Sequence, residues 1–132
     1  MNTEKILKKD LIYPELSYKI VGILFEVYNK IGAGHHEKYY QKAIALGLEK
    51  EGLIFSEQVY TPLIFRDAKI GSYFLDFLID NKIILEIKKG DRFSKNNIEQ
   101  IISYLKTHKL KLGMIANFGK DQLKFKRIIN FN

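Results

Sequence analysis

The sequence predicts an α/β fold in which helices flank a mixed β-sheet, and three observations lead to this prediction. Two stretches with helical periodicity come first, strand-like apolar runs follow, and a further helical stretch precedes the last of these runs. Strands joined by a tight turn pair antiparallel, whereas neighbouring strands joined through a helix pair parallel. We therefore expect the order α-α-β-β-β-β-α-β in one domain over residues 1–132, with residues 1–14 as an N-terminal extension.

The two N-terminal helices are predicted from apolar residues that recur at three- and four-residue steps. Pro14 suits the first turn of a helix over Glu15–Ile31, which Gly32-Ala33-Gly34 closes. A second helix is expected from about His35 to Glu51. Glu37 falls in its first turn, where the helix dipole favours a carboxylate, but it also adjoins the apolar face of that helix.

The remaining elements follow from apolar runs bounded by turn-forming residues. The expected strands are Leu53–Tyr60 and Leu63–Arg66, which flank Thr61-Pro62, then Ile70–Ile79, Ile83–Lys89 and Leu110–Phe118. Ser94 is a suitable N-cap for a helix over about Lys95–Thr107. The basic tail, Asp121–Asn132, is expected to form a short last element.

A predicted hairpin places two carboxylates opposite each other. Its turn is Asp80-Asn81-Lys82, so paired residue numbers sum to 162 and Asp76 lies across from Glu86. Alternation puts Lys88 on the same face as this pair. The other face is wholly apolar and is expected to be core; it comprises Tyr73, Leu75, Phe77, Ile79, Ile83, Leu85 and Ile87.

Such a carboxylate pair requires compensation. Opposed side chains on paired strands have Cβ atoms about 5 Å apart. At an effective dielectric constant near 20, two negative charges at that distance repel by about 3 kcal/mol. A divalent cation with oxygen ligands offsets this repulsion, and so does an ammonium group such as that of Lys88. A metal site and a solvated sheet face neutralised by Lys88 are both open at this point.

Charge is distributed unevenly along the chain. The formal net charge is +7, and residues 82–132 hold 12 Lys and Arg against 4 Asp and Glu. A basic half beside a carboxylate pair indicates a polyanionic partner, nucleic acid first, although a solvated lysine-rich surface has the same composition. Cysteine is absent and no apolar run is long enough to span a membrane, so we expect a cytoplasmic protein. The three histidines, His35, His36 and His108, are expected at the surface.

The order of these residues resembles that of the PD-(D/E)XK nuclease superfamily. Asp76 precedes Glu86-Ile87-Lys88 across a hairpin, and Gln100 and Tyr104 follow on a helix, as in the QxxxY branch that includes RecB-type nucleases and lambda exonuclease. The stretch from Gly34 to Tyr40 fits the Gly-x-x-Glu-x-x-Tyr pattern of the small bacterial GxxExxY proteins. The resemblance extends from about Leu16 to Asn130.

The resemblance implies a restriction-endonuclease-like αβββαβ core with two N-terminal helices. It also implies a Mg²⁺ or Mn²⁺ site whose ligands are Asp76, Glu86, the carbonyl group of Ile87, and Glu37 directly or through water. Lys88 would position or activate the attacking water and stabilise charge on the phosphate. Gln100 and Tyr104 would orient the metal site or the phosphate backbone, although they are equally a polar flank of their helix.

The expected function is therefore metal-dependent hydrolysis of nucleic acid, with DNA favoured over RNA. The alternative is a protein that binds nucleic acid or forms a complex on the same fold without turnover. A chain of this size has little room for elements that grip a substrate, so a homodimer or a protein partner is also expected. No membrane partner is expected.

Overall fold

The structure, a computed structural model, describes residues 12–131. Residues 1–11, which form most of the predicted N-terminal extension, lie outside the described residues. The elements follow in the order α2 (Pro14–Ile31), α3 (Glu37–Lys50), β1 (Phe55–Phe65), β2 (Ala68–Ile79), β3 (Ile83–Lys89), α4 (Lys95–His108), β4 (Leu112–Phe118) and β5 (Leu123–Ile129).

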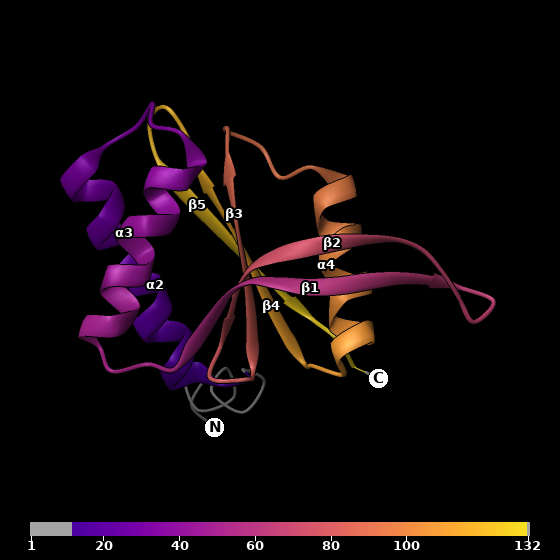
Figure 1. Cartoon of the computed structure of the whole chain (residues 1–132). Helices are drawn as coiled ribbons and strands as arrows, with labels where there is room; N and C mark the ends of the chain where they lie inside the picture. The colour runs from indigo at the N-terminus through magenta and orange to yellow at the C-terminus, as the bar shows by residue number, and fades with distance from the viewer. Residues whose placement is uncertain (1–11, 132) are drawn as a thin grey trace, which may run out of the picture.

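The predicted mixed sheet is confirmed. The strands lie side by side in the order β1-β2-β3-β4-β5 (Figure 1). Only β3 and β4 pair in parallel, because α4 connects them, and the other neighbours are antiparallel. The α/β fold class with two N-terminal helices is thus as expected.

Helices cover both faces of the sheet's centre. Helices α2 and α3 pack on one face and α4 packs on the other (Figure 1). On β3, Leu85 belongs to the cluster under α2 and α3, whereas its neighbour Ile84 belongs to the cluster under α4. Since both of its faces are buried, β3 reads as an almost continuous apolar run, and Glu86 stands out within it.

The prediction of one continuous core face on the hairpin is wrong in its outer part. Phe77 packs under α2 and α3, but Leu75 packs against α4, and the side chain of Tyr73 is 37% exposed. The apolar residues of this face of β2 therefore pack against α4 before Asp76 and under α2 and α3 after it. Opposite this point, β1 contains Gln58 with a positive φ of 50°, an unusual conformation inside a strand.

The predicted break at Thr61-Pro62 is also wrong, because β1 runs through it as one strand. Pro62 lacks an N–H, but β1 is an edge strand, so one side of its backbone needs no partner within the sheet. Three strands rather than four therefore precede α4. The basic tail supplies the fifth strand, β5.

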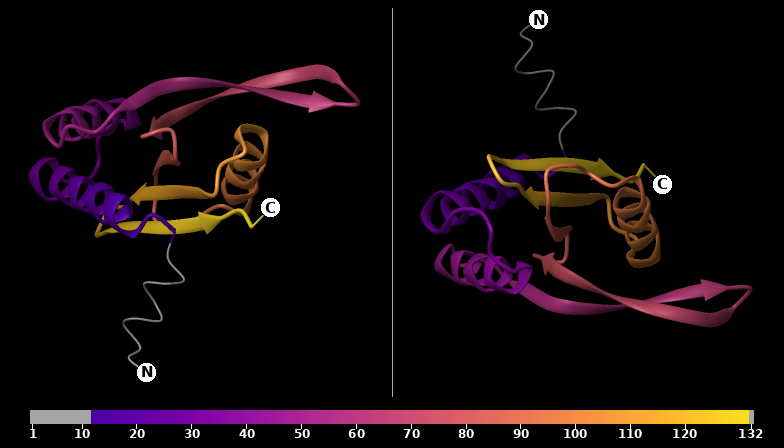
Figure 2. Two further views of the ribbon diagram at one scale, coloured as in Figure 1. Left: turned by 90° about the horizontal axis from the view of Figure 1, so that it is seen from below. Right: turned by 90° about the horizontal axis from the view of Figure 1, so that it is seen from above.

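The outer part of the β1–β2 hairpin, residues 59–74, forms an arm that extends past the sheet and over α4 (Figures 1 and 2). A hydrogen bond of 2.8 Å joins Thr61 Oγ1 to His108 Nε2 on α4. The rings of Tyr73 and Tyr104 lie 5.6 Å apart, centroid to centroid. His108 is thus half-buried under the arm rather than on the open surface that we expected.

The N-terminal helices are fastened to the end of β4, far away in the sequence. The hydroxyl of Tyr28 donates a hydrogen bond of 2.7 Å to the carbonyl of Gly119. The fully buried ring of Tyr40 stacks on Phe118, with 4.1 Å between ring centroids. These contacts place the first turn of α3 beside the C-terminal ends of β3 and β4.

Candidate active site

The site lies where β2 and β3 separate. Their paired residues are Ile79 with Ile83, Leu78 with Ile84, and Phe77 with Leu85, which is the predicted register. Beyond Phe77 and Leu85 the backbone pairing of β2 with β3 ends, and hydrogen bonds to side chains replace it. The amide of Asp76 donates to Glu86 Oε1 at 2.9 Å, and the amide of Ile87 donates to Asp76 Oδ2 at 2.8 Å. The two carboxylates therefore satisfy backbone donors that the separating strands would leave unpaired.

Both carboxylates are held in a desolvated place. The side chain of Glu86 is only 7% exposed. Burial, and after it the charge of Asp76, raises the pKa of Glu86 to about 8. Burial also raises the pKa of Asp76, although the amide of Ile87 and the charge of Lys88 act in the opposite direction. Without a bound cation the pair therefore retains a proton near neutral pH.

Lys88 lies two residues after Glu86 on β3, half-buried and on the same face as the carboxylates. Its charge lowers the pKa of both Asp76 and Glu86, so it is close enough to interact with each. Ion pairs with Lys88 are absent among residues 12–131. The ammonium group is thus near the pair without being paired to either member.

Glu37 projects from the first turn of α3 toward the end of β3. Its Oε1 accepts a hydrogen bond of 3.1 Å from the amide of Lys89. Its charge contributes to the raised pKa of Asp76 and of Glu86, so it lies near both. Nevertheless, no three His, Cys, Asp or Glu residues within the described part of the chain form a ready metal cluster. Glu37 is therefore a neighbour of the carboxylate pair rather than a third member of it.

Gln41, one helical turn after Glu37, belongs to the site but was not among the predicted residues. Its Nε2 donates to Asp76 Oδ1 at 2.8 Å, and its Oε1 accepts from Gln58 Nε2 at 3.2 Å. Asp76 thus receives hydrogen bonds on both oxygens, one from β3 and one from α3. The available signal was the spacing, since Glu37 and Gln41 lie on one helical face and Glu37 was already a candidate.

Helix α4 carries the two other predicted residues, Gln100 and Tyr104. Tyr104 is 5% exposed, and burial, followed by the charges of Glu86, Tyr73 and Asp76, raises its pKa to about 12. Gln100 lies one turn earlier, and both residues line a groove between α4 and the arm. Tyr104 therefore adjoins the carboxylates, and neither Tyr104 nor Gln100 forms a hydrogen bond to them within residues 12–131.

The donor set fits a hard divalent cation. Asp76 and Glu86 offer carboxylate oxygens from opposed strands, and the described residues include no thiolate. Their raised pKa values reflect desolvation and mutual repulsion, both of which a nearby cation would offset. Each oxygen that accepts one hydrogen bond keeps a further lone pair for such a ligand.

A hollow of about 440 Å³, which we call the basic hollow, lies at the C-terminal ends of β3 and β4. Gly34, Gly90 and Gly119 contribute backbone to its wall. Lys89 and Lys120 bring two positive charges to it, and Asp91 brings one negative charge. Because Lys89 directly follows Lys88, this basic hollow adjoins the carboxylate site.

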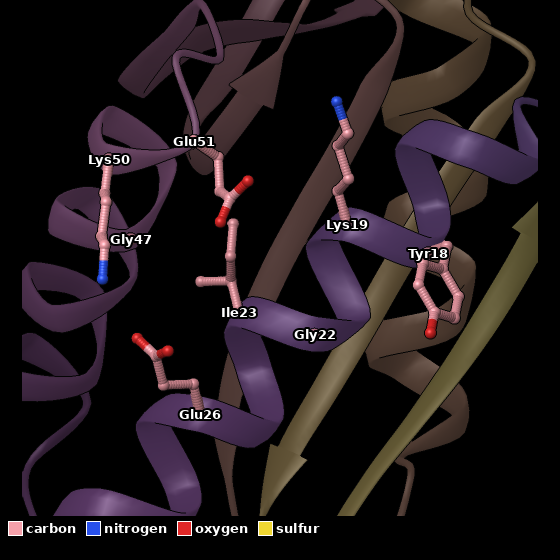
Figure 3. A pocket seen from close by; sticks show the side chains of 8 residues that line it. All are labelled: Tyr18, Lys19, Gly22, Ile23, Glu26, Gly47, Lys50 and Glu51. Atoms are coloured by element: carbon pink, nitrogen blue, oxygen red, sulfur yellow. The ribbon is translucent and has the colours of Figure 1, made fainter.

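Another hollow, of about 310 Å³, lies between α2 and α3, away from the carboxylates (Figure 3). It is lined from the middle of α2, between Tyr18 and Glu26, and from the C-terminal end of α3, whereas the site lies at the first turn of α3. Its charges balance, with Lys19 and Lys50 against Glu26 and Glu51. None of the residues around the carboxylate pair contributes to it.

The chain is similar to a known protein family and to a solved structure. A sequence profile described as the PD-(D/E)XK nuclease superfamily matches residues 14–128. The crystal structure of SSO0001 is similar to this chain over 91% of its length and 78% of the other chain, with 16% identity and a TM-score of 0.47. No curated protein sequence matches.

Among residues 12–131, no helix is long and apolar enough to cross a membrane. The profile match covers α2 to β4 and all but the last residue of β5, together with the carboxylate pair and Lys88. The chain belongs to the PD-(D/E)XK nuclease superfamily.

Proposed function

We propose that this protein is a nuclease that uses Mg²⁺ or Mn²⁺ to hydrolyse phosphodiester bonds of DNA, with RNA as the second substrate class. The observation that supports this most strongly is the carboxylate pair where β2 and β3 separate, in which Glu86 is buried and Asp76 half-buried, with Lys88 on the same face. The basic hollow beside Lys88 favours a polyanionic substrate.

Asp76, Glu86 and the carbonyl group of Ile87 would hold the cation, with Glu37 as a further ligand through water. A bound divalent cation lowers the pKa of an attached water and neutralises charge on the phosphate. Because Glu86 has a pKa of about 8 without it, loading the site at neutral pH would displace a proton from the carboxylate pair.

Lys88 would act on the substrate itself. Its ammonium group is half-buried beside the carboxylates, where the effective dielectric constant is lower than in water. There it would stabilise the negative charge that develops on the phosphate oxygens and orient the attacking water through a hydrogen bond. Gln100 and Tyr104 would orient the metal site from the α4 side.

Four finer assignments belong to the same proposal. We place the chain among the GxxExxY proteins, on the pattern from Gly34 to Tyr40, and in the branch with the QxxxY motif, on Gln100 and Tyr104. A cytoplasmic location is consistent with the absence of cysteine. A homodimer or a protein partner would enlarge the grip on the substrate, and light scattering with and without DNA would test this.

The test combines Mn²⁺ titration by calorimetry with cleavage assays on single-stranded, double-stranded and structured DNA and RNA. Wild type should bind Mn²⁺ and cleave, Asp76→Asn should lose both, and Lys88→Gln should bind metal but cleave at least a hundredfold more slowly. Asp80→Asn and Lys82→Gln, which alter the nearby turn outside the site, are matched controls and should behave as wild type.

The outcomes separate the two functions that the sequence leaves open. Metal binding that depends on Asp76, without cleavage of any substrate, would favour a non-catalytic nucleic-acid-binding protein. Failure to bind metal at all would make the opposed carboxylates a structural feature and overturn the proposal.

A further inference from the structure

A groove of about 310 Å³ lies between the arm and α4, and Tyr73, on the same strand as Asp76, contributes to its wall. In both views of Figure 2, α4 lies between the arm and strands β4 and β5, so the arm forms the outer wall of this groove. Tyr104 connects the groove to the site, because it lines the groove and its pKa responds to the charges of Glu86 and Asp76. The lining residues are Leu63, Tyr73, Asn96, Glu99, Gln100, Ser103 and Tyr104.

The chemistry of this lining suits a neutral, planar ligand with hydrogen-bonding edges. Asn96, Gln100 and Ser103 offer amide and hydroxyl groups that donate and accept hydrogen bonds. Tyr73 is 37% exposed and leans on the ring of Tyr104, so one aromatic wall remains available for stacking. Stacking on an aromatic ring together with polar contacts to the base edges is how unpaired bases are bound.

The same lining does not suit a phosphate group. Its one charged residue is Glu99, which would repel a phosphate. The basic hollow on the other side of the carboxylates has the opposite character, since Lys89 and Lys120 contribute to it and aromatic stacking surfaces are fewer there. A strand that crosses the site would therefore find cations for its backbone at one end and a surface for a base at the other.

We infer that the groove between the arm and α4 receives an unpaired nucleobase of the strand whose phosphate lies at Asp76 and Glu86. The inference deepens the proposed nuclease function and rests on it for the position of the phosphate. The bases of an intact duplex are stacked and paired, so entry into the groove requires a single strand, a frayed end or a base turned out of the helix. Single-stranded or locally opened nucleic acid is then the preferred substrate.

The experiment measures binding by fluorescence anisotropy in Ca²⁺, with the integrity of each oligonucleotide checked on a gel. The probes are a labelled single strand, its duplex, and single strands with one abasic site moved along the sequence. An abasic site keeps the phosphate and removes the base, so it reports base contacts alone. The variants are Tyr73→Ala, Tyr73→Phe and Asn96→Ala, and Tyr18→Ala is the matched control.

The single strand should bind at least tenfold more tightly than the duplex, and one abasic position should remove most of that advantage. Tyr73→Ala should weaken single-strand binding by about tenfold, the loss expected for one stacked base, whereas Tyr73→Phe should retain it. Asn96→Ala, on the exposed first turn of α4, should weaken binding severalfold without any effect on the fold. Tyr18 is 80% exposed in the hollow between α2 and α3, so its variant should bind as wild type.

Equal affinity for single strand and duplex, or an unchanged affinity in both Tyr73→Ala and Asn96→Ala, would overturn the inference. A cleavage assay with Mn²⁺ separates this failure from failure of the nuclease proposal. Base-dependent binding without cleavage would retain the groove and reject the nuclease. Cleavage of duplex as fast as single strand, with no effect of Tyr73→Ala, would retain the nuclease and reject the groove.

Discussion

The two halves of β2 differ in what they pair with, and they meet at Asp76. The inner half, Phe77–Ile79, pairs with both β1 and β3, and helices cover both of its faces. The outer half, residues 68–75, pairs with β1 alone, and Phe74 on it is 59% exposed. One continuous strand thus serves as a core strand and as one side of a projecting arm.

This difference explains how the carboxylates can occupy their positions. Beyond Phe77 and Leu85, β2 no longer pairs with β3. The backbone amides of Asp76 and Ile87 therefore lack ladder partners there, and the carboxylates accept hydrogen bonds from them. The inner half fixes the geometry, and the opening beyond it leaves space beside the pair. We expect stability to depend on the inner half and substrate binding to depend on the outer half.

The largest expected effect breaks the inner half. Phe77→Ala removes a fully buried ring from the cluster under α2 and α3, and it should lower the free energy of unfolding by about 3–5 kcal/mol. The matched change on the same strand, Phe74→Ala, should lower it by less than about 1 kcal/mol. Urea denaturation of both variants is the measurement. Similar losses in the two would contradict the division of β2.

The second prediction concerns the pH dependence of the metal-free protein. The pKa of Glu86 is raised in the folded state, so the folded chain binds more protons than the unfolded chain between about pH 4.5 and 8. The stability associated with Glu86 is therefore complete below this window and declines as the pH rises through it. The decline should exceed about 1.4 kcal/mol, the value of one pKa unit.

Glu86→Gln should flatten this decline, and Mn²⁺ should restore the stability of wild type but not of the variant. Thermal unfolding in EDTA at several pH values, followed by addition of metal, is the measurement. Glu99→Gln, an exposed change on α4, is the control. A wild-type profile that stays flat between pH 5 and 8 would show that the pair ionises without penalty.

The third prediction tests how the junction between the halves is held. Gln41→Ala removes the donor to Asp76 Oδ1 and leaves Gln58 without its acceptor. Loss of a residue that orients a metal ligand through a hydrogen bond commonly lowers metal affinity by about 10–100-fold. Gln41→Ala should therefore bind Mn²⁺ at least about tenfold more weakly. Calorimetry measures this, with Gln122→Ala on an exposed loop as the control. Unchanged affinity would mean that β3 alone orients Asp76.

The smallest effect concerns the attachment of the arm. Thr61→Val removes the hydrogen bond to His108 and should cost about 1 kcal/mol. Burial lowers the pKa of His108, so the folded chain binds fewer protons than the unfolded chain there. Its contribution is present above the ordinary histidine pKa and is lost as the pH falls below it, opposite in sign to that of Glu86. His108→Gln should remove this acid sensitivity, which urea titrations at pH 5 and 7.5 would detect.

Local features were predictable from the sequence. The register of β2 and β3 follows from a three-residue turn, because Asp80 and Asn81 tolerate the positive φ values, 54° and 53°, that the turn requires. With that register known, the opposition of Asp76 and Glu86 and the position of Lys88 follow from alternation. Helix limits were within one or two residues, since caps and periodicity are local as well.

Features that depend on distant contacts were not predictable in the same way. Gln41 acquires its role from Asp76, 35 residues later, and His108 acquires its role from Thr61 on the arm. Leu75 and Phe77 are both buried at alternate positions of β2, but they pack in different clusters, so one apolar stripe divides between two cores. Pro62 indicated a break because the pattern could not reveal that β1 is an edge strand.

The fastening of α2 to Gly119 also affects how the chain is made. The partners Tyr28 and Gly119 are 91 positions apart, and within residues 12–131 every strand is synthesised after both helices. At roughly 5–20 residues per second, the helix pair waits several seconds for the end of β4. During each round of translation this protein therefore presents an uncovered helical hairpin, which is the kind of surface that chaperones bind.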